Sequence, residues 1–323
     1  MLDSVEPQRP HPPCVSIVLP TYDRLKFLAA TIESIQRQSF ADWELLIADD
    51  GSGPELRAYL KQLERPPRIR VLWLAHSGNL SAVRNAAIHR ARGDYVAFVD
   101  SDDVWLPEKL ELQLQSLRRH VTRGWSYTGF IFVDEADIPL SGHRAKACPA
   151  IAGRILDALI RAEAVLAQSS VIVRRSLLAK VGGYDASMYL CGDYELWMRL
   201  AQESEVDFID QPLVRVRRHR EHCGSDVAAL EDLALILKRM RRSNLVPHLH
   251  STLQRRRATV SAQLARSHSI SSDRLAVLGT LLRDARFSWR YWNWWFTGLT
   301  STARVFAPEA LVSMLRTYRR KSA

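Results

Sequence analysis

The sequence predicts an α/β fold in which a Rossmann-like, mainly parallel sheet is flanked by helices and followed by a C-terminal helical module. Short apolar runs alternate with helical stretches over residues 15–117, which is the pattern of βαβ units with right-handed crossovers. Beyond residue 225 the periodicity is helical. We therefore expect a flexible segment over 1–14, an α/β domain over 15–225 and a basic, Trp-rich helical module over 226–323.

The elements of the α/β domain follow from the same patterns, taken in chain order. Short β-branched and aromatic runs predict strands over 15–19, 43–48, 69–74 and 95–99. Helices are expected between these strands, up to about residue 38, over 54–63 and over 80–91, and another begins at Pro107.

The second half of the domain has a mixed α+β pattern. Strands are expected over 125–133 and 170–174, helices over 155–162, 176–181 and 195–201, and a pair of strands over 206–209 and 213–217. Gly182 and Gly183 would end the second of these helices. In the C-terminal module we expect helices over 227–240, 248–267, 273–286 and 308–318.

Three carboxylates follow the strand over 95–99 within four residues, at Asp100, Asp102 and Asp103. In open α/β sheets, ligands bind outside the carboxyl ends of the strands, where we expect the Asp103 carboxylate to be exposed. Carboxylates this close repel one another, and a hard cation such as Mg²⁺ or Mn²⁺ would neutralise them. The alternative is an acidic cap for the helix that begins at Pro107, for which one Asp would suffice.

Two further strand ends carry polar residues that should reach the same edge of the sheet. Thr21 and Asp23 follow the first strand, and Asp49 and Asp50 follow the second. Because the carboxyl ends of parallel strands meet at one edge, these side chains should lie close to the Asp cluster.

Composition and charge limit the class of protein. The chain has 323 residues, 47% hydrophobic and 25% charged, which is ordinary for a soluble protein. Its four cysteines form no CxxC pair, so neither a zinc site nor a disulfide framework is indicated. There is no apolar run of 18 residues and no signal-peptide core in residues 1–13, so we expect a cytoplasmic protein.

The net charge of +10 is concentrated in the C-terminal module. Residues 226–323 hold 17 Lys and Arg against 6 Asp and Glu, a net +11, whereas residues 1–225 hold 28 against 29, a net −1. Such asymmetry indicates an anionic partner surface.

With these pieces assembled, the chain resembles the family 2 glycosyltransferases, which are inverting enzymes of the GT-A fold. The resemblance covers about residues 15–225, which would form the catalytic domain, and rests on six segments in the family's order. They are VSIVLPTYDR (15–24), WELLIADDGS (43–52), Gly78 through Arg84 and Asn85, GDYVAFVDSDD (93–103), VGGYD (181–185) and GDYELWMRL (192–200).

The resemblance implies a nucleotide site. Thr21 and Tyr22 would line the base and ribose pocket, Asp50 would accept a hydrogen bond from the uracil ring, Arg84 would reach the diphosphate, and Asp102 would face the ribose. Turn packing for the first two, a cap on the helix near Pro54 for Asp50 and a surface role for Arg84 stay open as alternatives.

The resemblance also implies a divalent cation, Mn²⁺ or Mg²⁺, bound by Asp103, with His219 as a further contact and His222 as its competitor. Asp193 would be the catalytic base that takes the proton from the acceptor hydroxyl. The family often has an acidic residue where Gly192 stands here, which removes one negative charge from the site. The alternative for Asp193 is a cap on the helix over 195–201.

The implied activity is transfer of a hexosyl group from a nucleotide-diphosphate sugar, by resemblance a UDP-sugar, to an acceptor hydroxyl. The acceptor would be a glycan or a lipid-linked sugar of cell-surface polysaccharide biosynthesis, with Gln168 and Ser169 facing it. A sugar nucleotidyltransferase is disfavoured because the turn after the first strand lacks the Gly-rich loop that holds a triphosphate. A non-catalytic basic binding protein would not need Asp50, Asp103 and Asp193 together.

Aromatic residues gather near the C-terminus, beside arginines. The cluster contains Trp289, Tyr291, Trp292, Trp294, Trp295 and Phe296. A Trp-rich amphipathic helix with basic neighbours suits an anionic membrane surface, and would hold the protein peripherally on the inner face of the cytoplasmic membrane. Ordinary core packing is the alternative, and no motif indicates nucleic-acid binding.

Overall fold

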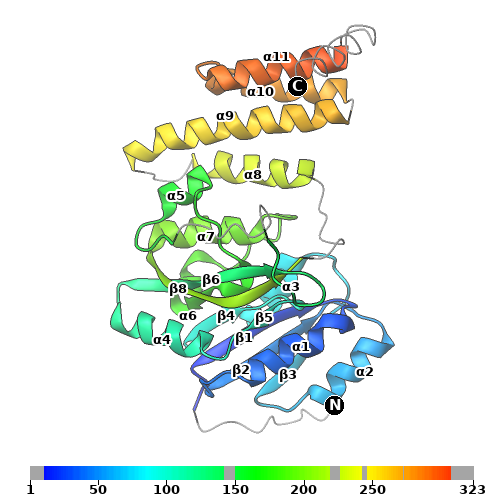
Figure 1. The fold of residues 1–323 in the computed structure, drawn as a ribbon, viewed down its shortest axis with the longest axis vertical. Helices are drawn as coiled ribbons and strands as arrows, with labels where there is room; N and C mark the ends of the chain where they lie inside the picture. The colour runs from blue at the N-terminus through cyan, green and yellow to red at the C-terminus, as the bar shows by residue number, and fades with distance from the viewer. Residues whose placement is uncertain (1–10, 142–149, 219–225, 242–245, 272, 307–323) are drawn as a thin grey trace. The chain divides into compact units, whose positions relative to one another are not determined.

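The computed structural model describes residues 11–141, 150–218, 226–241, 246–271 and 273–306. The chain divides into two compact units, 1–223 and 224–323. The first unit contains the sheet and the second is helical (Figure 1).

An eight-stranded sheet organises the first unit, with strand order β3-β2-β1-β4-β7-β6-β8-β5. The strands are β1 (Val15–Thr21), β2 (Trp43–Asp49), β3 (Ile69–Trp73), β4 (Tyr95–Phe98), β5 (Val104–Trp105), β6 (Arg123–Val133), β7 (Ile172–Arg174) and β8 (Glu205–Arg217). Strands β1 to β4 run parallel, as do β6 and β8, whereas β7 and β5 pair antiparallel with their neighbours. The predicted mainly parallel sheet is confirmed.

Helices lie along the sheet of the first unit, and alternation within the strands explains how both faces are covered. The helices are α1 (Leu25–Gln36), α2 (Pro54–Leu63), α3 (Leu80–Ile88), α4 (Lys109–Arg119), α5 (Leu156–Arg161), α6 (Arg175–Val181) and α7 (Gly192–Glu203), with a 3₁₀ turn η2 (Gln168–Ser170). Odd-numbered strand residues such as Ile17 and Leu45 form one core with α1, α2 and α4. On the other face, Phe98 of β4 contacts Tyr184 and Trp197. Strands buried on both sides read as continuous apolar runs, which is why the sequence revealed them.

One expectation about the strands is wrong. The segments 206–209 and 213–217 do not pair with each other, because both belong to β8, which pairs with β6 along its length. The register shifts around Gly129, opposite Pro212. A Cβ on Gly129 would lie 2.9 Å from the Gln211 oxygen, so glycine lets the two strands stay together through this irregularity.

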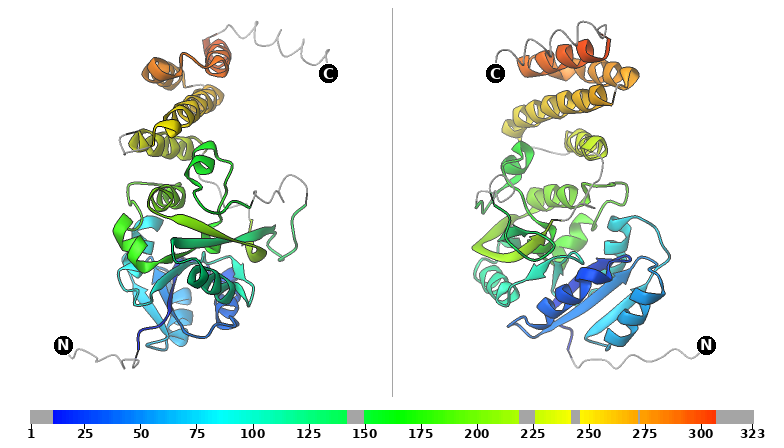
Figure 2. Two further views of the ribbon diagram at one scale, coloured as in Figure 1. Left: turned by 90° about the vertical axis from the view of Figure 1, so that its left-hand side faces the viewer. Right: turned by 45° about the vertical axis from the view of Figure 1, so that its right-hand side comes forward.

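The second unit consists of α8 (Asp226–Met240), α9 (Pro247–Ile270), α10 (Arg274–Ser288) and α11 (Trp292–Phe306). Helix α9 contacts the other three, and α10 and α11 lie side by side against it (Figure 2, left). The predicted helices over 227–240, 248–267 and 273–286 are confirmed, and the one over 308–318 lies outside the described residues. Among the helices that the structure describes, none has the length and apolar character needed to cross a bilayer.

The Trp cluster divides between core and surface. Trp294 is buried, and its indole N–H donates to Ser261 Oγ of α9 at 3.1 Å. Trp289, Trp292 and Trp295 are exposed. Trp294 therefore packs as ordinary core, whereas the membrane interpretation stays a prediction for the three exposed members.

Candidate active site

Polar residues from three neighbouring parallel strands meet at one edge of the sheet, as the sequence predicted. Thr21 of β1 is in register with Asp49 of β2, and Val18 of β1 with Phe98 of β4. Asp50 and Asp100 therefore follow strands on either side of β1. This edge holds most of the candidate site residues.

Asp50 organises a loop rather than capping a helix. Its carboxylate accepts hydrogen bonds from the backbone N–H groups of Ser77 at 2.8 Å and Gly78 at 2.9 Å. His76 Nδ1 lies 3.1 Å from Asp50 Oδ2. Helix α2 has Gly53 as its N-cap, with no side-chain capping bond, so the capping alternative for Asp50 is wrong.

An aromatic platform lies beside this loop. The rings of Tyr22 and His76 stack with centroids 4.2 Å apart and planes inclined by 20°. Tyr22 is partly exposed, whereas neighbouring Thr21 is buried and its hydroxyl has no hydrogen-bond partner in the described part of the chain. The platform therefore offers an exposed flat ring next to an unused hydroxyl.

Arg84 is the electrostatic centre of the site. It is buried, so the surface alternative is wrong, and its Nη2 lies 2.6 Å from Asp100 Oδ1. Burial acts to lower the pKa of Arg84, but the charge and hydrogen bond of Asp100, together with the charges of Tyr184 and Asp193, outweigh the effect of burial and the pKa is raised. The guanidinium also lies over the Tyr184 ring, 5.3 Å from its centroid. Arg84 thus remains a cation within a mostly buried site.

Asp193 approaches this centre from the start of α7. The helix begins at Gly192 with Cys191 as its N-cap, so Asp193 lies in the first turn and does not cap it. One carboxylate oxygen of Asp193 accepts the Tyr194 N–H at 2.7 Å. Burial raises the pKa of Asp193, while the charge of Arg84 opposes the rise. The carboxylate is therefore close to Arg84 and more basic than an ordinary Asp.

Packing explains why a glycine occupies position 192. A Cβ at this position would lie 2.5 Å from Ser81 Oγ of α3. Glycine therefore lets the beginning of α7 approach α3, the helix that carries Arg84. The departure from the family's acidic residue coincides with this close approach.

The last carboxylate of the Asp cluster is buried, although a free strand end predicted exposure. Asp103 Oδ1 accepts the Arg217 N–H at 3.0 Å, and Oδ2 accepts the Ser169 hydroxyl at 2.5 Å. Ser169 therefore serves the Asp cluster, not an open acceptor site. Asp102 pairs with Arg24 at 2.9 Å.

The donor set is compatible with a divalent cation that also binds phosphate. Burial, and then the charges of Asp100 and Asp102, raise the pKa of Asp103 well above its ordinary value. A cation would relieve this crowding of carboxylates. Within the described residues no three Asp, Glu, His or Cys side chains form a ready-made metal cage. Mg²⁺ is commonly held by one or two carboxylates together with substrate phosphates, so Asp102 and Asp103 fit that arrangement. His219 and His222 lie outside the described residues.

Sequence reasoning missed several residues that complete the site. Arg217 donates through Nε to the Asp102 carbonyl at 3.0 Å, fixing the Asp cluster to the end of β8. His76 was missed because it belongs to no recognised segment, whereas Arg24 stood in the segment 15–24 without a role of its own. Tyr184 was quoted only as part of a motif, yet its hydroxyl accepts a hydrogen bond from Gln168 at 2.5 Å.

Unsatisfied polar atoms also point to this edge. Among the described residues, the buried atoms Thr21 Oγ1, Arg84 Nε and Gln168 Oε1 have no hydrogen-bond partner. Buried polar groups nearly always have one. Seven other such atoms are spread over the described residues, but these three belong to residues that the other contacts place at the candidate site, where a polar ligand would satisfy them.

Comparisons with known proteins agree with this geometry. The model of Glycosyl transferase family 2 matches residues 16–138. The chain is 37% identical over 129 residues to the putative teichuronic acid biosynthesis glycosyltransferase TuaG of Bacillus subtilis, covering 40% of this chain and 51% of TuaG. It is 37% identical over 107 residues to WfgD of Escherichia coli, a UDP-Glc:α-D-GlcNAc-diphosphoundecaprenol β-1,3-glucosyltransferase, covering 33% and 42%. The chain spans about half the length of these two relatives.

Solved structures share the fold at low sequence identity. S. aureus TarS 1–349 in complex with UDP-GlcNAc matches with a TM-score of 0.63 and 18% identity, over 85% of this chain and 81% of that one. The mannosyltransferase PcManGT of Pyrobaculum calidifontis, in complex with GDP-Man and Mn²⁺, matches with a TM-score of 0.57 and 15% identity, over 91% and 88%.

Proposed function

The chain belongs to glycosyl transferase family 2, and we propose that it transfers a hexosyl group from a UDP-sugar to an acceptor hydroxyl with inversion at the anomeric carbon. The observation that carries the proposal is the cluster in which Arg84 lies beside Asp100 and near Asp193, at the edge formed by β1, β2 and β4. A cation flanked by carboxylates suits a diphosphate leaving group on one side and a proton acceptor on the other.

The donor would bind over the ends of β1 and β2. Thr21 and Tyr22 would contact the base and ribose, and Asp50 with its loop would read the uracil edge. A site built to hydrogen-bond one base edge rejects another by leaving polar groups unpaired. WfgD is named for a UDP-sugar and TarS was solved with one, whereas PcManGT holds GDP-Man. Proteins of this fold therefore differ in the nucleobase that they bind. We propose that Asp50 selects uracil in this chain.

Arg84, Asp102 and Asp103 would hold the diphosphate together with Mn²⁺ or Mg²⁺, with Asp102 also near the ribose and His219 as a further contact. When bound, the cation supplies Lewis-acid stabilisation of the charge that develops on the leaving nucleotide. Arg84 adds a fixed positive charge from a buried position that needs no rearrangement during the reaction.

Asp193 would act as the general base. Its carboxylate lies at the beginning of α7, and its raised pKa makes it a better proton acceptor than an ordinary Asp. It would take the acceptor's hydroxyl proton as the oxygen attacks the anomeric carbon. The other acidic residue of this turn, Glu195, is paired with Arg199.

For the acceptor we propose a lipid-linked sugar or a growing glycan in cell-surface polysaccharide biosynthesis. WfgD is named for a diphosphoundecaprenol-linked acceptor, and TuaG for teichuronic acid biosynthesis. We further propose that the enzyme acts in the cytoplasm, where the thiols of Cys14 and Cys191 would stay reduced.

Donor binding tests the proposal directly. We expect UDP with Mn²⁺ to raise the melting temperature of the full chain, because a ligand at 100 times its Kd adds about 2.7 kcal/mol to the free energy of unfolding. GDP at the same concentration should have a smaller effect, and a UDP-sugar should be hydrolysed or transferred slowly. Equal stabilisation by UDP and GDP would contradict the base assignment, and no stabilisation by either would contradict the nucleotide site.

A further inference from the structure

Helices α10 and α11 expose large apolar side chains on the sides turned away from α9. On α11, Trp292, Phe296 and Leu299 are 76%, 60% and 64% exposed. On α10, Leu275 and Leu282 are 84% and 77% exposed. Spacings of three, four and seven residues place the members of each set on one face of their helix.

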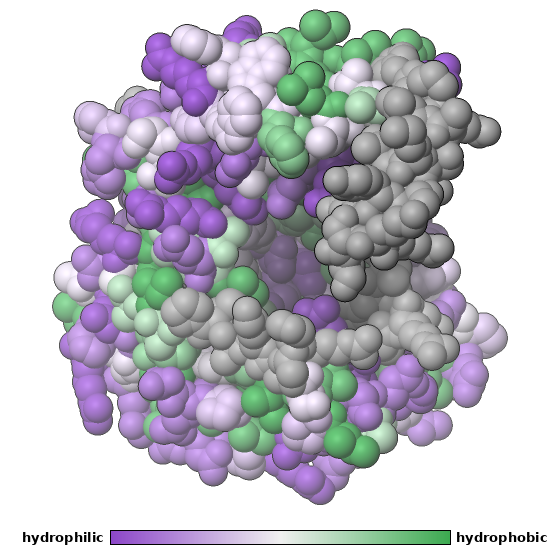
Figure 3. Space-filling view, turned by 45° about the horizontal axis from the view of Figure 1, so that its top comes forward, coloured by the Kyte–Doolittle hydropathy of each residue, from purple (hydrophilic) through white to green (hydrophobic). Residues whose placement is uncertain are grey.

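The opposite faces of the same helices make the contacts with α9, so the exposed faces have no partner among the described residues. Trp294 of α11 is buried against Ser261 of α9, and Val277 and Asp284 of α10 are also buried. In the end-on view, α10 and α11 lie side by side on α9 (Figure 2, left). The exposed apolar face of the pair, which we call the outer face, therefore points away from α9. With the top of Figure 1 turned forward, the space-filling view shows hydrophobic groups at the upper edge of the picture among hydrophilic ones (Figure 3).

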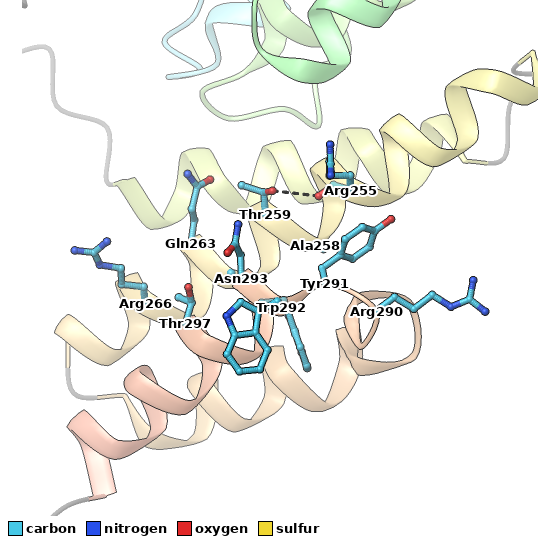
Figure 4. A pocket seen from close by; sticks show the side chains of 12 residues that line it. Arg255, Ala258, Thr259, Gln263, Arg266, Arg290, Tyr291, Trp292, Asn293 and Thr297 are labelled. Carbon is cyan, nitrogen blue, oxygen red and sulfur yellow. Dashed lines mark hydrogen bonds between the residues drawn. The ribbon is translucent and has the colours of Figure 1, made fainter.

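A basic cavity adjoins the outer face. It has a volume of about 490 Å³ and lies between α9 and α11, with Trp292 in its wall. Arg255, Arg266 and Arg290 line it, and Figure 4 shows Arg266 and Arg290 at opposite ends with Gln263 and Asn293 between them. All three arginines are exposed.

Helices α10 and α11 carry an excess of positive charge. Residues 274–306 contain five arginines and one acidic residue, Asp284, which is buried and paired with Arg283. A second copy of the chain would bring the same positive charge to the outer face, whereas an anionic surface would complement it. Trp and Arg next to exposed Leu and Phe are the combination that suits the headgroup region of a bilayer.

We propose that the outer face is a docking surface for an anionic phospholipid bilayer, with Trp292, Phe296, Leu299, Leu275 and Leu282 entering the headgroup boundary and the arginines of the adjoining cavity contacting lipid phosphates. Reversible attachment needs an apolar anchor and a basic patch together, and this unit has both. The proposal rests on the proposed function in one respect: a lipid-linked acceptor resides in a bilayer, which would explain why the enzyme docks there.

The test is co-sedimentation of the full chain with vesicles of phosphatidylglycerol and phosphatidylcholine, without donor or acceptor, so its outcome does not depend on transferase activity. We expect binding at low salt, much weaker binding at 1 M salt where the Debye length falls to about 3 Å, and little binding to phosphatidylcholine alone. Trp292→Ser/Phe296→Ser should weaken partitioning roughly tenfold or more. Val121→Ser, at a residue 79% exposed in the first unit, is the matched control and should bind normally.

A charge variant gives a second, independent readout. Arg255→Gln/Arg266→Gln/Arg290→Gln should weaken binding about fivefold per arginine at low salt. Arg57→Gln/Arg90→Gln/Arg119→Gln removes the same charge from exposed arginines of the first unit and should have little effect. Failure of the full chain to sediment at low salt would overturn the proposal. So would equal losses in both arginine variants, or a change of oligomeric state in Trp292→Ser/Phe296→Ser with no change in vesicle binding, which would make the outer face a contact between copies.

Discussion

Replacing Arg84 with glutamine removes the cation that lies beside Asp100 and near Asp193. The replaced bond is short, 2.6 Å from Nη2 to Asp100 Oδ1, and the Arg84 side chain is 7% exposed. A hydrogen bond between charged groups contributes about 1.5–3 kcal/mol. Because the Asp100 side chain is 33% exposed, water compensates part of the loss, and we expect a cost of about 2 kcal/mol. That corresponds to a decrease in melting temperature of about 4–8 °C for a unit of this size.

The functional effects of Arg84→Gln should be larger than the loss of stability. UDP affinity should fall about tenfold, which corresponds to about 1.4 kcal/mol for a lost charged contact with the diphosphate. The acidic limb of the kcat profile should move to higher pH, because the charge of Arg84 holds down a pKa of Asp193 that burial raises. With that charge gone, Asp193 stays protonated, and inactive as a base, over a wider range of pH.

Arg92→Gln is the matched control for this experiment. Arg92 pairs with the buried carboxylate of Glu44 at 2.8 Å, away from the strand ends, so its loss should lower the melting temperature without changing UDP affinity or the pH profile. The measurements are calorimetric melting, titration with UDP and Mn²⁺, and kcat against pH. If Arg84→Gln and Arg92→Gln behave alike in all three, Arg84 has no role beyond structure and our assignment of the site is wrong.

Three further predictions follow from the site and its support. Asp193→Asn should lower kcat by about 10²-fold or more while UDP affinity stays the same; near-normal turnover at saturating substrates would exclude it as the base. Asp103→Ala should abolish the Mn²⁺-dependent part of UDP binding and also lower the melting temperature, since Ser169 and the Arg217 N–H lose their acceptor; UDP titrations that respond to Mn²⁺ as in the unaltered chain would refute it. Burial lowers the pKa of Lys109 well below its ordinary value. Unfolding therefore takes up a proton wherever the pH lies between the folded and the unfolded pKa, and in that range the free energy of unfolding should rise with pH by up to about 1.4 kcal/mol per unit. Lys109→Met should remove this slope, and an unchanged slope in denaturant titrations between pH 7 and 9 would contradict the burial argument.

The sequence predicted strands β1, β2 and β4 well because they are buried on both faces. The run over 95–99 contains no polar residue and the run over 43–48 contains only Glu44, and the observed strands β2 and β4 differ from these runs by one residue at the end. Gly182 was also foreseen as a helix end, and its φ of 87° confirms the left-handed conformation.

The errors have a common physical origin, which is contact between residues far apart in the chain. The exposure expected for Asp103 failed because its partners, Ser169 and Arg217, come 66 and 114 residues later. The strand pair expected around Pro212 failed because β6 supplies the partner for both segments. No local pattern encodes either contact, so periodicity and turn signals could not reveal them.

The Asp cluster connects two strands that are consecutive in the chain but far apart in the sheet. It lies between β4, which pairs with β1 and β7, and β5, which pairs with β8 at the far edge. Two bonds fasten the crossing: Arg217 N–H to the Asp103 carboxylate and Arg217 Nε to the Asp102 carbonyl. Leu106 continues the connection through its N–H to the Leu213 carbonyl at 2.9 Å.

Nucleotide binding at the Asp cluster and local opening of the sheet edge between β5 and β8 are therefore thermodynamically linked. Opening of the edge between β5 and β8 would displace Asp102 and Asp103, whose carboxylates we propose hold a cation and diphosphate. The two equilibria must then influence each other equally in both directions. The rate of amide hydrogen exchange at Leu106 and along β5 should then report on the proposed nucleotide binding, although these amides lie away from the nucleotide. We expect the exchange to become slower when nucleotide binds at the strand ends. A substitution at this edge, with no contact to the donor, would in turn weaken donor binding by the amount that it eases the opening.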